Sequence, residues 1–210
     1  LNFFIHSGII NSYNQARDIP SLESTSTLSA ALSLGTISCR AVWNGAQISK
    51  KIATDEYQKN SIDIWIKELA WREFYQNALF NFPELEKGPY RKKWFNFPWG
   101  NRTDWFEAWE NGFTGIPIID ASMRQLKNSG WMHNRCRMIV ASFLVKDLLI
   151  DWRWGESFFM KNLVDGDLAS NNGGWQWSAS SGMDPKPLRI FNPFRQASKF
   201  DENGTYIRKW

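Results

Sequence analysis

Apolar side chains recur at three- and four-residue intervals along much of the chain, which is the spacing of one face of an α-helix. The longest case is residues 61–82, with apolar positions at Ile62, Trp65, Ile66, Leu69 and Ala70. Pro83 follows, and proline is strongly disfavoured inside a helix, so one long helix is predicted to end there. The alternation of period two that is typical of strands hardly occurs. The pattern predicts an all-α fold.

Shorter helices are predicted before this long helix. Residues 25–34 open with a run of hydroxyl side chains suited to a helix N-terminus and end at Gly35, which is typical of a helix C-terminus. Ser38 then suits the start of a second short helix.

Beyond the long helix the pattern alternates between loops and helices. Residues 83–115 carry several prolines and glycines among many aromatic residues, which predicts loops and short helical turns. Residues 118–127 and 132–149 predict two helices, and another short helix is expected after Gly155. Residues 165–177 are rich in glycine and acid, which predicts a loop or a helix entrance close to a ligand. No repeat or long linker interrupts 1–210, so one domain is expected.

The composition is that of an ordinary globular chain and narrows the function classes. Charged residues make up 22%, hydrophobic residues 43%, and glycine and proline 14 and 8 positions, which excludes disordered and collagen-like chains. With two cysteines and two histidines, neither a disulfide framework nor a Cys/His metal site is expected. The longest apolar stretch, residues 138–145, is short of the roughly 18 residues of a membrane span. A soluble, cytoplasmic, metal-free protein is expected.

Large rings and a mild positive charge point to a flat or polyanionic partner. The chain holds 13 Trp, 15 Phe and 5 Tyr, and its formal net charge is +4. A mild excess of basic residues is compatible with nucleic acid but is common in proteins that bind none.

Two helical segments carry candidate chemistry. The hydroxyls of 25–29 stand at a predicted helix start and could hold an anion such as a diphosphate, although simple N-capping explains them as well. Trp65, Glu68 and Arg72 share one face of the long helix, and Trp71 lies at its edge. This group is either a ring-lined binding surface with two exposed tryptophans or a solvated Glu68–Arg72 pair.

The next candidate group spans the helix that starts near Trp131. Trp131, Asn134, Arg135 and Met138 form one stripe, in which the amide and the thioether could meet a flat apolar ligand. Arg135 and the nearby Arg137 could contact phosphates or pair with a buried acid; a surface turn is the alternative.

The segment from Asp165 to Trp177 combines acids and rings. Asp165 and Asp167 flank Gly166, and Arg137 is a candidate partner for these carboxylates; the sequence downstream does not continue as a calcium-binding EF-hand loop. Trp175 and Trp177 diverge by about 200° on a helix, so they are expected to serve different surfaces unless both merely pack.

Four segments together resemble a known family. Residues 25–32, 68–75, 130–138 and 165–177 resemble, in order and over nearly the whole chain, the FAD-binding helical domain of DNA photolyases. The resemblance is closest to the class I enzymes that act on cyclobutane pyrimidine dimers. It implies a U-shaped FAD whose isoalloxazine lies at the floor of a cavity that receives a flipped dimer. Excited reduced flavin donates an electron, the cyclobutane bonds split, and the electron returns.

The resemblance also implies roles for individual residues. Positions matching flavin contacts are Tyr13, Thr25, Ser26, Thr27, Leu28, Ser29, Trp65, Glu68, Arg72, Asn134, Arg137, Asp165, Gly166, Asp167 and Asn171. Positions matching contacts to the lesion or to DNA are Arg17, Glu68, Trp71, Arg72, Tyr75, Asn134, Arg135, Met138, Trp177 and Gln196. Glu68 and Asn171 match residues close to the chemistry, Asn171 beside the flavin N5, and Trp99, Trp152 and Trp175 match an electron relay.

The sequence differs from the family pattern in places, and other functions remain as alternatives to dimer repair. Thr27 stands where many relatives carry a basic residue, and the α/β antenna domain that precedes this domain in relatives is not in the sequence, so this chain is expected to be a fragment. A cryptochrome photoreceptor is the main alternative and a non-enzymatic helical DNA-binding module another. Asn134 and Met138 stand where six-four repair enzymes carry paired histidines, which favours dimer repair. A bacterial monomer is expected, with dimer-containing DNA as its partner and with association with the nucleoid when bound.

Overall fold

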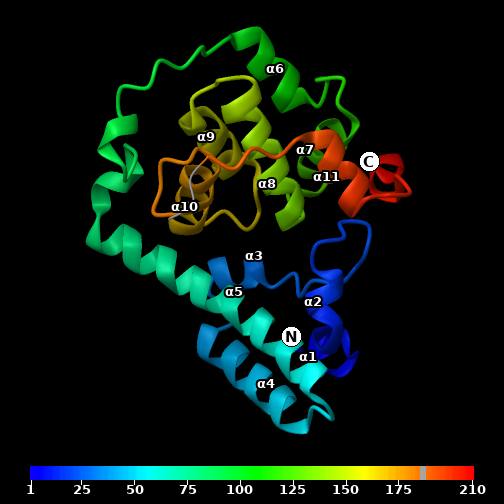
Figure 1. The fold of residues 1–210 in the computed structure, drawn as a ribbon. Helices are drawn as coiled ribbons and strands as arrows, with labels where there is room; N and C mark the ends of the chain where they lie inside the picture. Colours follow the sequence, from blue (N-terminus) through cyan, green and yellow to red (C-terminus); the bar gives the residue numbers. More distant parts are fainter. Residues whose placement is uncertain (185–187) are drawn as a thin grey trace.

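The computed structural model describes residues 1–184 and 188–210, and every regular element within these ranges is a helix (Figure 1). The all-α prediction is confirmed. The first elements in chain order are α1 (Asn2–His6), η1 (Ile9–Ser12), α2 (Tyr13–Ala16), α3 (Ser29–Ser33), α4 (Cys39–Ile52) and α5 (Glu56–Asn81).

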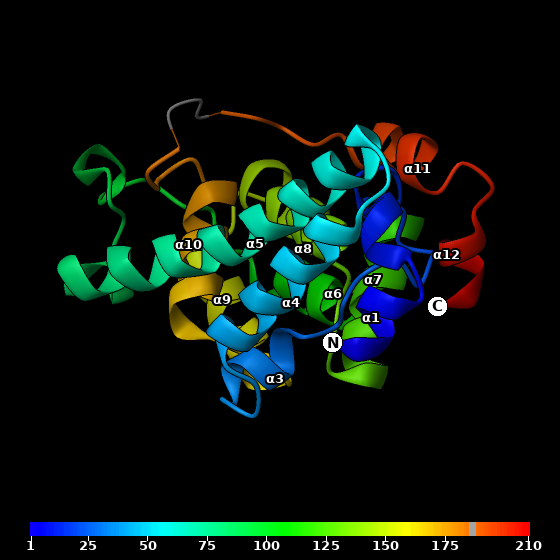
Figure 2. The ribbon, with the colours of Figure 1, turned by 90° about the horizontal axis from the view of Figure 1, so that it is seen from below.

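The later elements form the upper part of the molecule in Figure 1. They are η2 (Pro83–Glu86), η3 (Lys92–Trp94), α6 (Thr103–Asn111), α7 (Pro117–Ser129), α8 (Asn134–Ser142), the π-helical η4 (Phe143–Asp147), α9 (Trp152–Asn162), α10 (Leu168–Ser178), α11 (Pro193–Phe200) and α12 (Thr205–Lys209). Helices α11 and α12 lie on the side away from the C-terminal end of α5 (Figures 1 and 2).

Two separate hydrophobic cores organise these helices. The first core holds Ile10, Val42 and Ile62 and joins the N-terminal helices to the first half of α5. The second core, which is larger, is centred on α7, α8 and α9. Helix α5 contacts α2 and α4 in the first region and α10 in the second. It therefore bridges the two regions.

Local sequence explains where the central helices begin and end. Asp55 accepts a hydrogen bond from the Gln58 amide (2.8 Å), which caps α5 five residues before the apolar periodicity begins. The helix ends at Asn81, ahead of Pro83, as predicted. Ser38 accepts from the Ala41 amide (3.1 Å) and caps α4, but α4 has 14 residues and is not short.

Other predicted boundaries are wrong. Helix α3 covers residues 29–33, because Leu28 occupies the N-cap position and offers no capping side chain. Residues 83–115 contain the nine-residue helix α6 in addition to short turns. Helix α9 begins at Trp152, ahead of Gly155, because Asp151 accepts from the Arg153 amide (3.0 Å) and caps it.

The predicted helix 132–149 is divided. Helix α8 starts at Asn134, where His133 caps it, and the chain changes to π-helical geometry from Phe143 to Asp147. Gly130, at the end of α7, has φ of 66° and packs closely against Val164. A side chain at this position is disfavoured both by the left-handed backbone conformation and by a clash with Val164. No helix in the described part of the chain is long and apolar enough to cross a bilayer.

Candidate functional site

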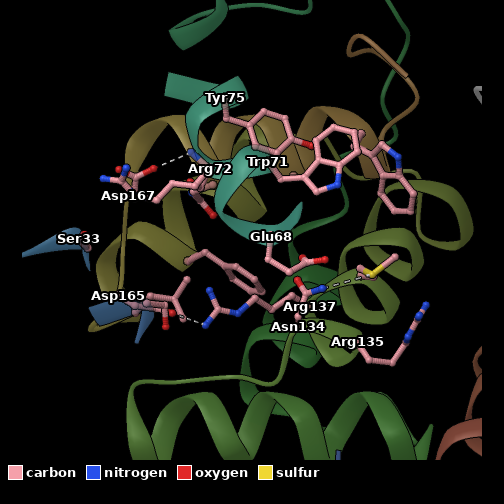
Figure 3. Close-up of a pocket in the computed structure, with 18 of the residues that line it drawn as sticks. Ser33, Glu68, Trp71, Arg72, Tyr75, Asn134, Arg135, Arg137, Asp165 and Asp167 are labelled. Carbon is pink, nitrogen blue, oxygen red and sulfur yellow. Dashed lines mark hydrogen bonds and ion pairs between the residues drawn. The ribbon is translucent and has the colours of Figure 1, made fainter. Parts of the chain in front are cut away.

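A cavity of about 620 Å³ lies between the two cores. Its walls come from α3, α5, α8, α9, α10 and the segment before α10 (Figure 3). The predicted site residues that line it are Arg17, Ser26, Leu28, Ser29, Trp65, Glu68, Trp71, Arg72, Tyr75, Asn134, Arg135, Arg137, Met138, Asp165, Gly166, Asp167, Asn171, Trp175 and Trp177. The fold thus brings together segments that are more than 100 residues apart in the chain.

Six predicted residues do not line this cavity. Tyr13 is buried in the first core, where burial raises the pKa of its hydroxyl. Gln196 lies on α11, and the other four are Thr25, Thr27, Trp99 and Trp152.

The hydroxyl run at 25–29 does not cap α3. The Thr27 hydroxyl donates to the Ser26 carbonyl (2.8 Å), and Thr27 itself is exposed with φ of 50°. Ser26 and Ser29 line the cavity. Ser33, which the sequence reading missed, also lines it and donates to the Gly166 carbonyl (2.8 Å). Its spacing of four residues from Ser29 could have identified it, since both lie on one face of α3.

Arg137 and Asp165 form the predicted ion pair. The Arg137 guanidinium reaches an oxygen of Asp165 at 2.8 Å and also donates to the Met132 carbonyl (2.7 Å). The Asp165 side chain is 2% exposed, and its other oxygen, Oδ1, has no hydrogen-bond partner in the described residues. A buried carboxylate oxygen without a partner is costly, so this atom indicates a place for a ligand donor.

Asp167 has a different role from Asp165. One of its oxygens accepts from the Ser170 amide (2.8 Å) and caps α10, and the other accepts from Gln76 on α5 (2.7 Å). Asp167 therefore fixes the start of α10 against α5, and its two oxygens already have partners.

The polar face of α5 differs from both readings of the sequence. Glu68 pairs with Arg17 (2.6 Å), 51 residues away, instead of with Arg72. Trp65 is 4% exposed and belongs to the first core, so the expectation of two exposed tryptophans is wrong. Trp71 is 54% exposed and stacks on Tyr75, with ring centroids 6.0 Å apart.

Helix α8 presents the predicted stripe from Asn134 onward, because Trp131 lies ahead of the helix. The Asn134 amide points to the Met138 sulfur (3.9 Å), and both residues line the cavity (Figure 3). Arg135 pairs with Asp18 (2.8 Å) and lies 4.3 Å above the Phe200 ring.

The two tryptophans of α10 serve different surroundings, as predicted. Trp175 is 2% exposed and meets Phe159 edge to face, with centroids 5.0 Å apart. Trp177 is half-buried, with Phe191 at 5.8 Å and the Arg189 guanidinium at 5.8 Å from its ring.

Burial lowers the pKa of two groups near the site. It lowers the pKa of His133, directly before α8, to about 4, with a smaller opposing effect of Asp18. It also lowers the pKa of Lys146 to about 8. The Lys146 ammonium contacts the Arg189 carbonyl and so holds the segment that carries Arg189 into the cavity wall.

A second cavity of about 520 Å³ lies behind three of the same rings, Trp71, Tyr75 and Trp177. Its other walls include Phe74 and Tyr90. These rings therefore form a partition with apolar space on both sides.

The site thus combines buried charge, helix termini and hydroxyls on one side with aromatic rings on the other. Residues 65–210 match the family described as the FAD binding domain of DNA photolyase, and the chain belongs to this family. The resemblance and the flavin cofactor it implied are confirmed.

Individual proteins to which the chain is similar include two photolyases and a cryptochrome. The chain is 60% identical over 201 residues to a deoxyribodipyrimidine photo-lyase of Synechococcus, covering 96% of this chain and 42% of that protein. A class III photolyase of Agrobacterium tumefaciens superposes with a TM-score of 0.90 at 48% identity, covering 99% of this chain and 42% of that one. A cryptochrome of Synechocystis superposes with a TM-score of 0.90 at 34% identity, covering 100% and 43%. The chain spans less than half the length of these relatives.

Proposed function

We propose that the protein containing this chain uses bound FAD and light to split cyclobutane pyrimidine dimers in DNA. The observation that carries this proposal is one cavity that joins a buried, partly unsatisfied ion pair, Arg137–Asp165, to a mouth walled by Trp71 and Trp177. The first feature suits a polar cofactor edge and the second suits an unstacked pyrimidine pair.

The cavity fits a flavin by the chemistry of its donors and acceptors. The free oxygen of Asp165 can accept from a ring N–H, and the hydroxyls of Ser26 and Ser29 can donate to phosphate oxygens. Asn171, which lines the cavity and whose amide donates to the Glu156 carbonyl (3.0 Å), can orient toward the flavin ring. When bound, FAD supplies the light-driven electron for dimer splitting.

The mouth of the cavity suits a flipped pyrimidine dimer. The rings of Trp71 and Trp177 can stack on the lesion, and each stacked base is typically worth about 1 to 3 kcal/mol. Asn134 and Met138 offer one amide edge and one polarisable surface, and Glu68 and Arg72 add charged groups on α5.

Trp175, Trp152 and Trp99 suit an electron relay from the cavity to the surface. Trp175 packs against α9 at Gly155, where an added Cβ would lie 2.1 Å from its ring, and Trp152 stands one helical turn earlier on α9. Two hydrogen bonds tie the chain after Trp99 to the chain before Trp152: Gly100 N to Leu149 O (2.8 Å) and Asp151 N to Asn101 Oδ1 (2.8 Å). Trp175 and Trp152 are buried and Trp99 is half-buried, which suits a path from the cavity toward the surface.

The decisive experiment measures flavin binding and loss of the pyrimidine dimer in the same sample. The purified protein is examined by absorption, then illuminated with blue light in the presence of reductant and an oligonucleotide with one thymine dimer. Bound flavin with loss of the dimer supports the proposal. Bound flavin that photoreduces without repair favours a cryptochrome-like photoreceptor, and a folded protein that takes up no FAD contradicts the proposal.

The variant Trp175→Phe tests the relay separately from repair. It is expected to slow photoreduction of oxidised flavin at least tenfold, because phenylalanine is much harder to oxidise, while pre-reduced protein repairs at nearly the original rate. Trp109→Phe is the matched control, since Trp109 is a buried core tryptophan next to Trp175 (6.1 Å) that is outside the proposed relay. Equal loss of both activities in Trp175→Phe would refute the relay.

A further inference from the structure

Four charged side chains form one connected group at the rim of the cavity. Glu68 pairs with Arg17 (2.6 Å), and Asp18 pairs with Arg135 (2.8 Å). Asp18 also lies 4.0 Å from the Nε atom of Arg17, so it stands between the two arginines. All four residues line the cavity. Three of them, Arg17, Glu68 and Arg135, match residues that contact DNA or the lesion in relatives, whereas Asp18 has no assigned role.

Each arginine of this rim group is held from more than one side. The Arg17 guanidinium lies 5.1 Å from the Tyr13 ring centroid, and that of Arg135 lies 4.3 Å from the Phe200 ring centroid. The Nε atom of Arg135 is buried and has no hydrogen-bond partner in the described residues. Its contact with Asp18 therefore carries much of the polar stabilisation of this guanidinium.

The rim group is neutral as a whole, which limits what a phosphate can gain from it. A phosphate that approaches Arg135 competes with Asp18, and one that approaches Arg17 competes with Glu68. Undamaged DNA offers phosphates but no flipped base, so Glu68 keeps Arg17 and Asp18 keeps Arg135.

A flipped base changes this arrangement. When Glu68 turns to a base edge, Arg17 loses its partner, and the nearest other carboxylate is Asp18, already 4.0 Å away. We propose that Asp18 is a specificity-determining residue that exchanges its partner from Arg135 to Arg17 when a base engages Glu68, which releases Arg135 to bind a backbone phosphate. This inference rests on the proposed function. It makes full phosphate binding conditional on a base in the cavity.

The test compares binding to two duplexes in the dark. One carries a single thymine dimer and the other has the same sequence undamaged, and both are titrated at several salt concentrations. Asp18→Asn is expected to tighten binding to undamaged DNA about two- to fivefold, the usual worth of a partly exposed ion pair. The slope of log K against log salt is expected to steepen by about 0.9, corresponding to one more phosphate contact. Affinity for the damaged duplex changes less, so discrimination falls.

Two further variants separate this proposal from a general charge effect. Asp63→Asn makes the same change in net charge by removing the partner of Lys50 (2.6 Å), outside the cavity lining, and is expected to change neither the discrimination nor the slope. Asp18→Glu keeps the carboxylate and is expected to retain most of the discrimination, which a merely misfolded Asp18→Asn protein would not explain.

Glu68→Gln provides the sharpest check. The variant removes the carboxylate that pairs with Arg17, so Arg17 pairs with Asp18 even without a flipped base, and Arg135 is released. Binding to undamaged DNA is therefore expected to tighten. Binding to the damaged duplex is expected to weaken, because the base loses its contact with the Glu68 carboxylate. In an Arg135→Gln background the same change is expected to give no gain on undamaged DNA, because Arg17 then pairs with Asp18 and no arginine of the rim group is free. Equal tightening on both duplexes in Asp18→Asn, or an undiminished gain from Glu68→Gln in the Arg135→Gln background, would overturn the exchange while leaving the proposed function intact. A wild-type protein that does not prefer the damaged duplex would instead contradict the proposed function and this inference with it.

Discussion

Two groups of rings, each with one member on α10, have different surroundings. In the buried ring cluster, Trp109, Phe159 and Trp175 of the second core, Trp175 meets each of the other two rings edge to face. The ring wall, Trp71, Tyr75 and Trp177, separates two cavities, and Trp71 is exposed whereas the other two rings are half-buried. Helix α10 contributes one tryptophan to each group, because residues two apart on a helix point in different directions.

The difference suits the two functions proposed for tryptophan in this chain. Trp175, the member of the buried cluster that belongs to the proposed relay, is fixed by close neighbours, as an electron relay requires if its members are to keep constant separations. Rings in the wall have free space beside them, as stacking on a ligand requires. A glycine faces each group of rings, so this contrast can be measured by substituting the glycine by alanine. The change in stability then shows whether the rings can move to accommodate one methyl group.

Gly155→Ala is expected to have the largest effect. Its Cβ would lie 2.1 Å from the Trp175 ring and 2.7 Å from Leu144, and both neighbours are buried. Overpacking of a closed core typically costs about 1 to 3 kcal/mol, and we expect the upper end, about 3 kcal/mol, in the free energy of unfolding. Denaturant titration of the flavin-free protein measures it.

Gly173→Ala is the matched control for this prediction. Its Cβ would also lie 2.1 Å from a ring, that of Tyr75, but Tyr75 borders open space on both sides. The ring can move, so a loss of about 1 kcal/mol is expected. A loss equal to that of Gly155→Ala would mean that the ring wall is as rigid as the core.

Trp71→Ala tests the ring wall as a binding surface. Because Trp71 is exposed and stacks on the proposed lesion, its removal is expected to weaken binding to dimer-containing DNA by about 1 to 3 kcal/mol. Binding is measured at fixed salt, with undamaged DNA as the reference. Unchanged affinity would remove Trp71 from the lesion contacts.

The packed region also carries a predictable response to acid. His133 is 1% exposed and its Nδ1 accepts from the Arg135 amide, so its neutral form is favoured and burial lowers its pKa from 6.5 to about 4. The unfolded state therefore binds more protons between these values. The contribution to stability is complete above pH 6.5 and declines as the pH falls toward 4.

At pH 5.5 this loss is expected to be about 1.2 kcal/mol relative to pH 7. His133→Asn keeps a capping side chain but cannot titrate, so its stability should lack this component. Urea titrations of both proteins at pH 5.5 and pH 7 measure the difference. An identical decline in the variant would assign the acid sensitivity to other groups.

Local patterns in the sequence predicted the helices well and their irregularities poorly. The end of α5 follows from Pro83, whereas its first five residues are mostly polar and depend on the Asp55 cap. The π-helical turn at 143–147 lies inside an apolar run, in which nothing distinguishes π from α geometry.

At the site too, contacts suggested by sequence motifs were predicted, whereas contacts made by the tertiary fold were not. Arg137 was a candidate partner of Asp165 because the two carboxylates beside Gly166 require a basic group. The partner of Glu68 was not, because spacing along a helix favours Arg72 and says nothing of Arg17 in another element. Asp18 was missed for the same reason: its importance comes from the two arginines that the fold places beside it.

Gly174→Ala gives the smallest expected effect and the opposite sign. Nothing lies within 4 Å of the Cβ position at Gly174, because this residue faces the cavity from the middle of α10. Alanine is favoured over glycine inside a helix by about 0.8 to 1.0 kcal/mol, so the flavin-free protein should be stabilised by up to that amount. The same methyl group would enter the space proposed for FAD. Stabilisation together with weakened flavin uptake would therefore place the cofactor against this face of α10, whereas stabilisation with unchanged uptake would place it elsewhere in the cavity.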